Sequence, residues 1–198
     1  FCGRLLHGLE TTARTSGNPV LPAVLPLGWA LLWWFGIGFY EIHYWVAYAS
    51  QAPAGLLFVV ATALLLEMLG LHWRWADCRH AALLLLPALW IAAAMADDRG
   101  HHPLAGLMLL ALPAAFVCHY WLLARQERTA SDDARFVVVL RLVRHIGAWW
   151  LAILVVALEL AWLGKRLAPG VSLWPMLAWG LAPVLGLALA GFALRREL

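Results

Sequence analysis

Six long apolar stretches alternate with short polar connections along the chain. The apolar stretches are residues 22–40, 54–73, 81–96, 104–123, 146–163 and 174–194. A helix needs about 20 apolar residues to cross the hydrocarbon core of a bilayer. The stretches are continuous rather than alternating, which argues against the strands of a membrane barrel. The pattern therefore predicts an all-α, polytopic transmembrane helix bundle with about six spans.

Prolines interrupt three of these stretches. Pro87 lies inside the short third stretch, Pro113 near the middle of the fourth and Pro183 inside the sixth. Membrane helices tolerate proline because neighbouring groups satisfy the backbone carbonyls that it frees. The prolines are therefore compatible with six spans.

The composition agrees with lipid as the main solvent. Hydrophobic residues make up 64% of the chain and charged residues 13%, whereas soluble domains carry about 25% charged residues. The 13 tryptophans suit a protein that is anchored at two membrane–water interfaces. The first residue is Phe1, so we expect the chain to be part of a longer protein. We expect a cytoplasmic N-terminal tail over residues 1–18 and the helical bundle over residues 19–198.

The basic residues predict the orientation. With six spans, eleven of the lysines and arginines fall on one side of the membrane and three on the other. Cytoplasmic loops carry the excess of basic residues in membrane proteins. Both termini are therefore predicted to be cytoplasmic.

Two glutamates lie deep inside apolar stretches. Glu67 is in the second stretch, toward its cytoplasmic end, and Glu159 is in the outer half of the fifth. A charged acid at mid-bilayer costs roughly 2.5 kcal/mol or more. Each glutamate must therefore have a partner, a hydrated cavity or a proton. For Glu67 the candidate partners are His119, Arg141 and Arg144, and both a polar clasp between helices and the handling of a proton or substrate fit its position.

A second group of polar residues is predicted on the outer side, near Glu159. Its members are Glu41, His43, Asp97, Asp98, His101 and His102. Carboxylates and imidazoles relay protons, act as acids and bases, and bind cations. Their spacing matches no helix-face metal motif, and exposed loop residues of these types are often only solvated. No metal and no cofactor are predicted.

The connection between the fourth and fifth stretches has a different character. Ser131 is a plausible N-cap, and the helical pattern continues from it to residue 163. Such a helix is longer than the bilayer core, so its first turns project from the core. The basic residues among its valines and leucines suit contact with anionic lipid, or with a docking partner. These residues are Arg135, Arg141 and Arg144.

Small residues predict close helix packing. Ala182, Gly186 and Ala190 recur every four residues in the sixth stretch, and Gly36 and Gly38 lie in the first. Such ridges let another helix approach closely. Packing inside the chain is favoured over dimerisation.

Two stretches of the sequence are similar to a known family. The first contains His102-Pro103-Leu104-Ala105, Leu112-Pro113-Ala114-Ala115-Phe116, His119-Tyr120-Trp121-Leu122-Leu123 and Glu127. The second contains His145, Trp149-Trp150-Leu151, Leu158-Glu159-Leu160-Ala161-Trp162, Trp174, Ala178-Trp179-Gly180-Leu181 and Pro183. Over about residues 97–185 they resemble the C-terminal part of the bacterial membrane proteins grouped as domain of unknown function 2339. The resemblance implies a multi-pass protein of the bacterial inner membrane and assigns no activity and no catalytic residue.

Three functions fit these observations. The leading one is transport or flipping of an envelope-related substrate by the buried acids Glu67 and Glu159. The second is a membrane-embedded enzyme acting on a lipid-linked or cell-envelope substrate at the outer face. The third is a non-catalytic scaffold in which the acids only clasp helices together. The expected partners are the lipid bilayer and the remaining helices of the parent protein, and no phosphate-binding or nucleic-acid-binding motif is present.

Overall fold

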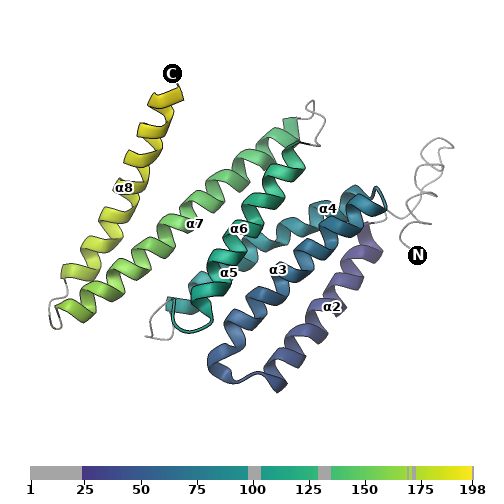
Figure 1. Cartoon of the computed structure of the whole chain (residues 1–198), viewed down its shortest axis with the longest axis horizontal. Coiled ribbons are helices and arrows are strands. Elements are labelled where there is room, and N and C mark those ends of the chain that lie inside the picture. Colours follow the sequence, from purple (N-terminus) through teal and green to yellow (C-terminus); the bar gives the residue numbers. More distant parts are fainter. Residues whose placement is uncertain (1–23, 98–103, 129–134, 169, 171–172, 198) are drawn as a thin grey trace. The chain divides into compact units, whose positions relative to one another are not determined.

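The computed structural model describes residues 24–97, 104–128, 135–168, 170 and 173–197, and every regular element in these residues is helical (Figure 1). The elements are α2 (Val24–Trp45), α3 (Tyr48–His72), α4 (Ala76–Ala81), the short 3-10 helix η1 (Ala82–Leu84), α5 (Leu85–Asp97), α6 (Met108–Glu127), α7 (Arg135–Leu167) and α8 (Leu173–Glu197). The all-α prediction is confirmed. Each of the six apolar stretches forms helix, the third as the series α4, η1 and α5.

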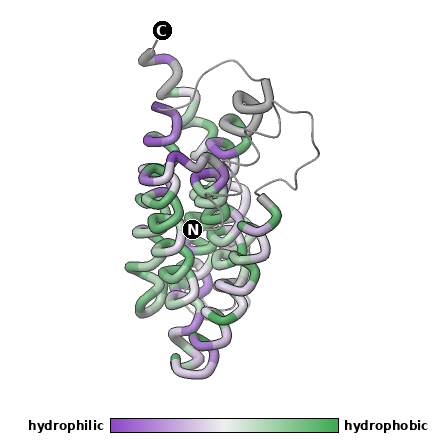
Figure 2. The backbone as a smooth tube through the Cα atoms, turned by 90° about the vertical axis from the view of Figure 1, so that its right-hand side faces the viewer, coloured by the Kyte–Doolittle hydropathy of each residue, from purple (hydrophilic) through white to green (hydrophobic). Residues whose placement is uncertain are grey.

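Four helical segments among the described residues are long and apolar enough to cross a membrane. They are Tyr48–His72, Asp77–Ala94, Met108–Glu127 and Leu142–Leu167. Helix α8 contributes a shorter apolar stretch, Met176–Phe192, and α2 carries many tryptophans and tyrosines. Figure 2 shows apolar residues along much of the helical backbone. The fold is therefore that of a membrane helix bundle.

The start of α5 explains how the third stretch accommodates its proline. The 3-10 helix η1 ends at Leu84 and α5 begins at Leu85, so Pro87 lies in the first turn of α5. The first turn of an α-helix tolerates proline because its N–H groups have no partner within the helix. Pro87 therefore interrupts no span.

The chain divides into two compact units. The first contains residues 1–85 and 113–130, and the second contains residues 86–112 and 131–198. In the first unit, α2 and α3 form a hairpin (Figure 1). The Gln51 side-chain amide donates to the carbonyls of His43 at 3.1 Å and Val46 at 3.2 Å. Gln51 thus satisfies one carbonyl in the last turn of α2 and one in the connection that follows it.

Aromatic residues and one glycine hold α2 against α3. The Phe58 ring of α3 stacks on Trp34, with 5.8 Å between ring centroids, and a Cβ on Gly38 would overlap the Phe58 ring. The Trp34 indole N–H also donates to the Thr62 hydroxyl at 3.0 Å. Gly38 therefore serves close packing as predicted, whereas Gly36 has no atom within 4 Å of its Cβ position.

In the second unit, α8 packs along α7. A Cβ on Gly186 would overlap the side chain of Ile153, and Ile153, Ala157 and Ala182 form a buried cluster. The predicted small-residue ridge therefore packs within the chain at Ala182 and Gly186. Because α7 has 33 residues, it is about 50 Å long and exceeds the roughly 30 Å hydrocarbon core. The long helix is therefore confirmed from Arg135 onward, while Ser131 lies outside the described residues.

Candidate functional site: a buried carboxylate cluster

Glu67 is the most enclosed charged residue of the described part of the first unit. Its side chain is 0% exposed, although α3 is apolar on both sides of it. The Glu67 Oε1 lies 3.1 Å from Arg79 Nε, and the Glu67 Oε2 accepts a hydrogen bond from Gln126 Nε2 at 3.0 Å. A second guanidinium follows, with Arg125 Nε 3.8 Å from Oε1. The expectation that the buried acid has a partner is confirmed.

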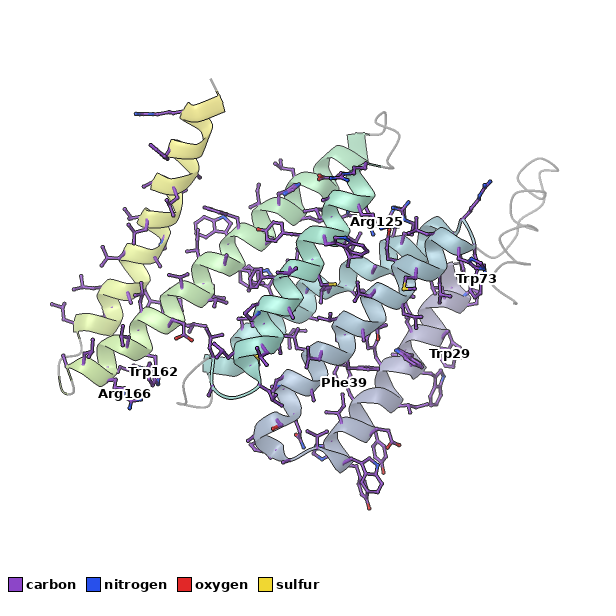
Figure 3. All side chains as sticks on the ribbon, in the orientation of Figure 1. Trp29, Phe39, Trp73, Arg125, Trp162 and Arg166 are labelled. Carbon is purple, nitrogen blue, oxygen red and sulfur yellow. The ribbon has the colours of Figure 1, made fainter. Side chains whose placement is uncertain are left out.

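These four residues come from three helices. Glu67 is on α3, Arg79 on α4, and Arg125 and Gln126 are on the last turns of α6. Figure 3 labels Arg125 at this end of α6. Gln126 Nε2 also donates to the backbone carbonyl of Arg79 at 2.7 Å. Because a side-chain amide has two N–H donors, Gln126 binds α3 and α4 at once.

A tight turn after α3 brings Arg79 back onto Glu67. The Trp75 N–H donates to the Gly70 carbonyl at 2.8 Å, and the Arg74 N–H points to the Leu71 carbonyl at 3.4 Å. Arg74 has a φ of 53°. This is the Schellman pattern, in which a residue of left-handed conformation ends the helix. The turn reverses the chain, so that α4 runs back beside the last turns of α3.

Gly70 makes the close approach of α4 possible. A Cβ at this position would overlap the Cγ of Arg79 and would lie 3.0 Å from the Trp75 carbonyl oxygen and 3.1 Å from the Arg79 nitrogen. Gly70 lies three residues beyond Glu67, which places both residues on one face of α3. The absent side chain therefore leaves the space that the stem of Arg79 occupies.

The arrangement keeps the Glu67 carboxylate buried and in contact with polar partners. One oxygen of Glu67 pairs with a guanidinium and the other accepts an amide hydrogen bond, so both are engaged. A buried carboxylate with such partners avoids the large cost of an isolated charge in an apolar medium. Through these contacts the cluster connects α3, α4 and the end of α6.

The sequence did not identify these partners of Glu67. In the sequence, Arg79 and Arg125 contribute only to the predicted orientation, and nothing distinguishes Gln126. Of the candidate partners, His119 is buried in α6 at 1% exposure, Arg144 is half-buried in the second unit, and the Arg141 side chain lies outside the described part. Arg79 returns to α3 through the left-handed conformation of Arg74, which the residue pattern does not mark.

Glu159 has a different environment in the second unit. Its side chain is half-buried on α7, and its Oε1 accepts a hydrogen bond from the Leu104 N–H at 3.1 Å. Leu104 precedes the start of α6 by four residues, in a region of turns. Glu159 therefore anchors the backbone that leads into α6.

The predicted outer group is only partly within the described residues. Glu41 is exposed on α2 and accepts a hydrogen bond from Trp45 Nε1 at 2.8 Å, and His43 is exposed nearby. Asp97 ends α5, and its side chain lies outside the described part, as do the residues Asp98, His101 and His102. Glu41 and His43 belong to the first unit and Glu159 to the second, so a joint cluster stays a prediction.

The described residues contain no candidate metal site and only part of the predicted lipid contact. Within the described residues, no three His, Cys, Asp or Glu side chains are grouped so that they would hold a metal ion. Cys78 and Cys118 are buried. For contact with anionic lipid, Arg135 and Arg141 lie on α7 with side chains outside the described part, and Arg144 is half-buried. That contact therefore stays a prediction.

Comparisons with known proteins give one match. Neither the curated proteins nor the solved structures yield a match to this chain. A family model described as "Predicted membrane protein (DUF2339)" matches residues 13–198. The match confirms the resemblance found in the sequence and extends it from residues 97–185 to nearly the whole chain. The chain belongs to this family of predicted membrane proteins, DUF2339.

Proposed function

We propose that this chain is a scaffold module of a membrane protein, in which buried acids fix the helices of the bundle. The observation that carries the proposal is the fully enclosed carboxylate of Glu67, held by Arg79 and Gln126 from two other helices. A residue that handles a proton or a substrate has to be reached from one side of the membrane. Glu67 is 0% exposed, which supports a structural role for it.

A double-mutant cycle on Glu67 and Arg79 tests the scaffold proposal. The purified protein and its Glu67→Gln, Arg79→Gln and doubly substituted variants would be unfolded in detergent, and their free energies of unfolding compared. Both single variants break the buried pair and should lose stability. Arg79→Gln should lose less than Glu67→Gln, because Arg125 at 3.8 Å and Gln126 at 3.0 Å still face the carboxylate. The double variant should lose less than the sum of the two, because the residues interact directly.

An additive result would contradict the clasp. Glu41→Gln is the matched control, because Glu41 is exposed and hydrogen-bonds a residue of its own helix, Trp45. That variant should unfold with nearly the free energy of the unsubstituted protein. A Glu67→Gln variant that is as stable as the Glu41→Gln variant would return Glu67 to the transport hypothesis.

Transport or flipping of an envelope-related substrate is the second candidate function. Glu159 supports it, because its half-buried carboxylate lies in the apolar part of α7. Acids inside membrane spans often mark substrate or proton pathways. The test is flux of labelled envelope lipids through vesicles that contain the protein, with and without Glu159→Gln. Equal flux with and without the substitution would remove Glu159 from such a pathway.

The enzyme alternative would act at the outer face through residues 97–102 together with Glu41 and His43. Residues 98–102 lie outside the described part, and no observation favours this function.

For localisation, we propose a multi-pass protein of the bacterial inner membrane. The distribution of basic residues supports a cytoplasmic position for the end of the first unit that carries the Glu67 cluster.

A further inference from the structure

An exposed stripe of large side chains runs along one side of α2. Its members recur every three or four residues, which places them on one face of the helix. They are 56% to 68% exposed, and they are Trp29, Trp33, Ile37, Tyr40 and Tyr44. The face that packs on α3 is a different one, because Phe58 contacts Trp34 and Gly38 there. The stripe is therefore a surface of this hairpin that α3 does not cover.

The C-terminal end of the stripe is built from aromatic rings that meet at an angle. The Tyr40 and Tyr44 rings are nearly parallel, at 14°, with their centroids 6.4 Å apart. The Trp45 ring stands at 81° to the Tyr44 ring, with 5.0 Å between centroids, and Trp45 is 75% exposed. The faces of aromatic rings are electronegative and attract cations such as ammonium groups. These rings therefore favour a cation over an anion.

A carboxylate lies beside the rings. Glu41 is exposed, and its Oε2 accepts a hydrogen bond from Trp45 Nε1 at 2.8 Å. That donor is a neutral indole N–H, so the bond holds the carboxylate without adding a positive charge. The hairpin of α2 and α3 is described throughout and contains no Lys or Arg. His43 is two residues from Glu41, and residues at this spacing do not face each other on a helix. The three rings and the carboxylate form the aromatic corner, which consists of Tyr40, Glu41, Tyr44 and Trp45.

The aromatic corner is level with one end of a membrane span. The candidate span of α3 begins at Tyr48, and Gln51 in its first turns donates to the carbonyls of His43 and Val46 at the end of α2. Tyrosine and tryptophan are enriched at the depth where a span meets water. From this depth the stripe continues along α2 toward the hydrocarbon as an apolar surface. Its position is that of a lipid, with the headgroup at the corner.

We propose that the aromatic corner binds the ammonium group of a phosphatidylethanolamine headgroup, and that an acyl chain of the same lipid lies along Trp29, Trp33 and Ile37. An ammonium group is attracted by the ring faces and forms a charge-assisted hydrogen bond with the Glu41 carboxylate. A soluble cation would leave the apolar part of the stripe uncovered, and an anionic headgroup would be repelled by Glu41. The site does not depend on the scaffold role of Glu67.

Native mass spectrometry of the purified protein tests the proposal with two lipids that differ only at the amine. Phosphatidylethanolamine carries the ammonium group, whereas N-acetyl-phosphatidylethanolamine with the same acyl chains lacks this positive charge. The unsubstituted protein should bind phosphatidylethanolamine about three-fold more tightly, which is the size expected of an exposed cation–aromatic contact. Equal binding of the two lipids would overturn the proposal.

Glu41→Gln tests whether this preference arises at the aromatic corner. Glutamine keeps an acceptor for the Trp45 N–H and removes the negative charge. The preference for phosphatidylethanolamine over its N-acetyl derivative should therefore fall toward equal binding. An unchanged preference in this variant would place the recognition of ammonium elsewhere on the protein and would contradict the site.

A matched pair of tryptophan substitutions tests the rings. Trp45→Leu removes one ring of the aromatic corner, and Trp179→Leu removes a tryptophan of α8 that is also exposed. Trp45→Leu should weaken phosphatidylethanolamine binding about three-fold, whereas Trp179→Leu should leave it unchanged. Equal weakening by the two substitutions would indicate general aromatic anchoring at the interface and would overturn the proposal.

Two competitors distinguish phosphatidylethanolamine from other ligands of an aromatic surface. Free ethanolamine at millimolar concentration should not displace the lipid, because it has no acyl chain to cover the stripe. Displacement would identify a site for a soluble cation and would overturn the assignment to a lipid. A glucosyl diacylglycerol presents a sugar ring in place of the ammonium group, and it should bind more weakly. Tighter binding of this glycolipid than of phosphatidylethanolamine would overturn the choice of ammonium.

Discussion

Gly70 lies so close to Arg79 that a Cβ on the glycine would overlap the Cγ of the arginine. Arg79 is the residue that pairs with the buried carboxylate of Glu67 at 3.1 Å. The ion pair therefore depends on the missing side chain at Gly70. Gly70, one helical turn from Glu67, thus leaves the space in which Arg79 pairs with the Glu67 carboxylate.

Gly70→Ala should lower the free energy of unfolding of the protein. In Gly70→Ala the added methyl group meets the stem of Arg79, the Trp75 carbonyl oxygen and the Arg79 nitrogen, and overpacking of this kind costs about 1–3 kcal/mol. The better helix propensity of alanine returns up to about 1 kcal/mol. The net expectation is a loss of about 1 kcal/mol, measured by equilibrium unfolding in detergent.

Gly36→Ala is the control for Gly70→Ala. No atom lies within 4 Å of the Cβ position of Gly36, so alanine there should leave stability unchanged or raise it. Gly70→Ala should also reduce the cost of Glu67→Gln, because the pair is already weakened. A cost of Glu67→Gln that is the same in both backgrounds would show that Gly70 does not position Arg79.

Replacing Arg74 with glycine should raise the stability of the protein. Its φ of 53° is a left-handed conformation that disfavours a residue with a Cβ by roughly 1 kcal/mol. Arg74→Gly should therefore stabilise the purified protein by about 0.5–1 kcal/mol, with the Schellman turn retained. The measurement is the midpoint of thermal unfolding.

The control for Arg74 separates conformation from charge. Arg74→Ala removes the same charge and keeps the Cβ, so it should give no gain. A gain of equal size in the alanine variant would mean that charge repulsion, rather than the backbone conformation, limits the stability of this turn.

The helices were predictable from the sequence because apolar runs of sufficient length are local signals. The six stretches and the extra length of α7 follow from composition alone, and the ridge of Ala182 and Gly186 follows from spacing. The partners of Glu67 depend instead on a chain reversal at Arg74, a residue type that rarely adopts positive φ. Nothing in the residue pattern marks Arg74 as left-handed, so Arg79 was interpreted as a loop charge.

The hydrogen bond between α2 and α3 should contribute measurably to stability. Thr62→Val keeps the shape of the side chain but removes the acceptor of the Trp34 indole N–H. Hydrogen bonds between membrane helices contribute about 0.6–1.7 kcal/mol, so a loss in this range is expected in equilibrium unfolding. Thr62→Ser retains the hydroxyl and should lose less. Equal losses in the two variants would assign the effect to packing rather than to the hydrogen bond.

The loss of stability in Gly186→Ala should be partly restored by shortening the side chain of Ile153. Gly186→Ala places a methyl group against the Ile153 side chain and should destabilise the pairing of α7 and α8 by about 1 kcal/mol. Ile153→Val shortens that side chain and should recover part of the loss in the double variant. Gly191→Ala, where no atom lies within 4 Å, is the control and should be neutral. A double variant whose loss equals the sum of the two single losses would contradict direct contact.

Glu159 distinguishes the two leading functions of the chain. Its carboxylate accepts the Leu104 N–H at 3.1 Å, and the carbonyl oxygen of a glutamine is able to accept the same bond. A structural role therefore predicts that Glu159→Gln keeps most of the stability. Glu159→Leu, which leaves the amide without this acceptor, should lose about 1–3 kcal/mol of stability.

A transport role predicts a different result for Glu159→Gln. That variant should fold normally but abolish flux, because glutamine carries neither the charge nor the proton. Unfolding and flux measured on the same two variants thus separate an anchor for the start of α6 from a residue on a substrate pathway.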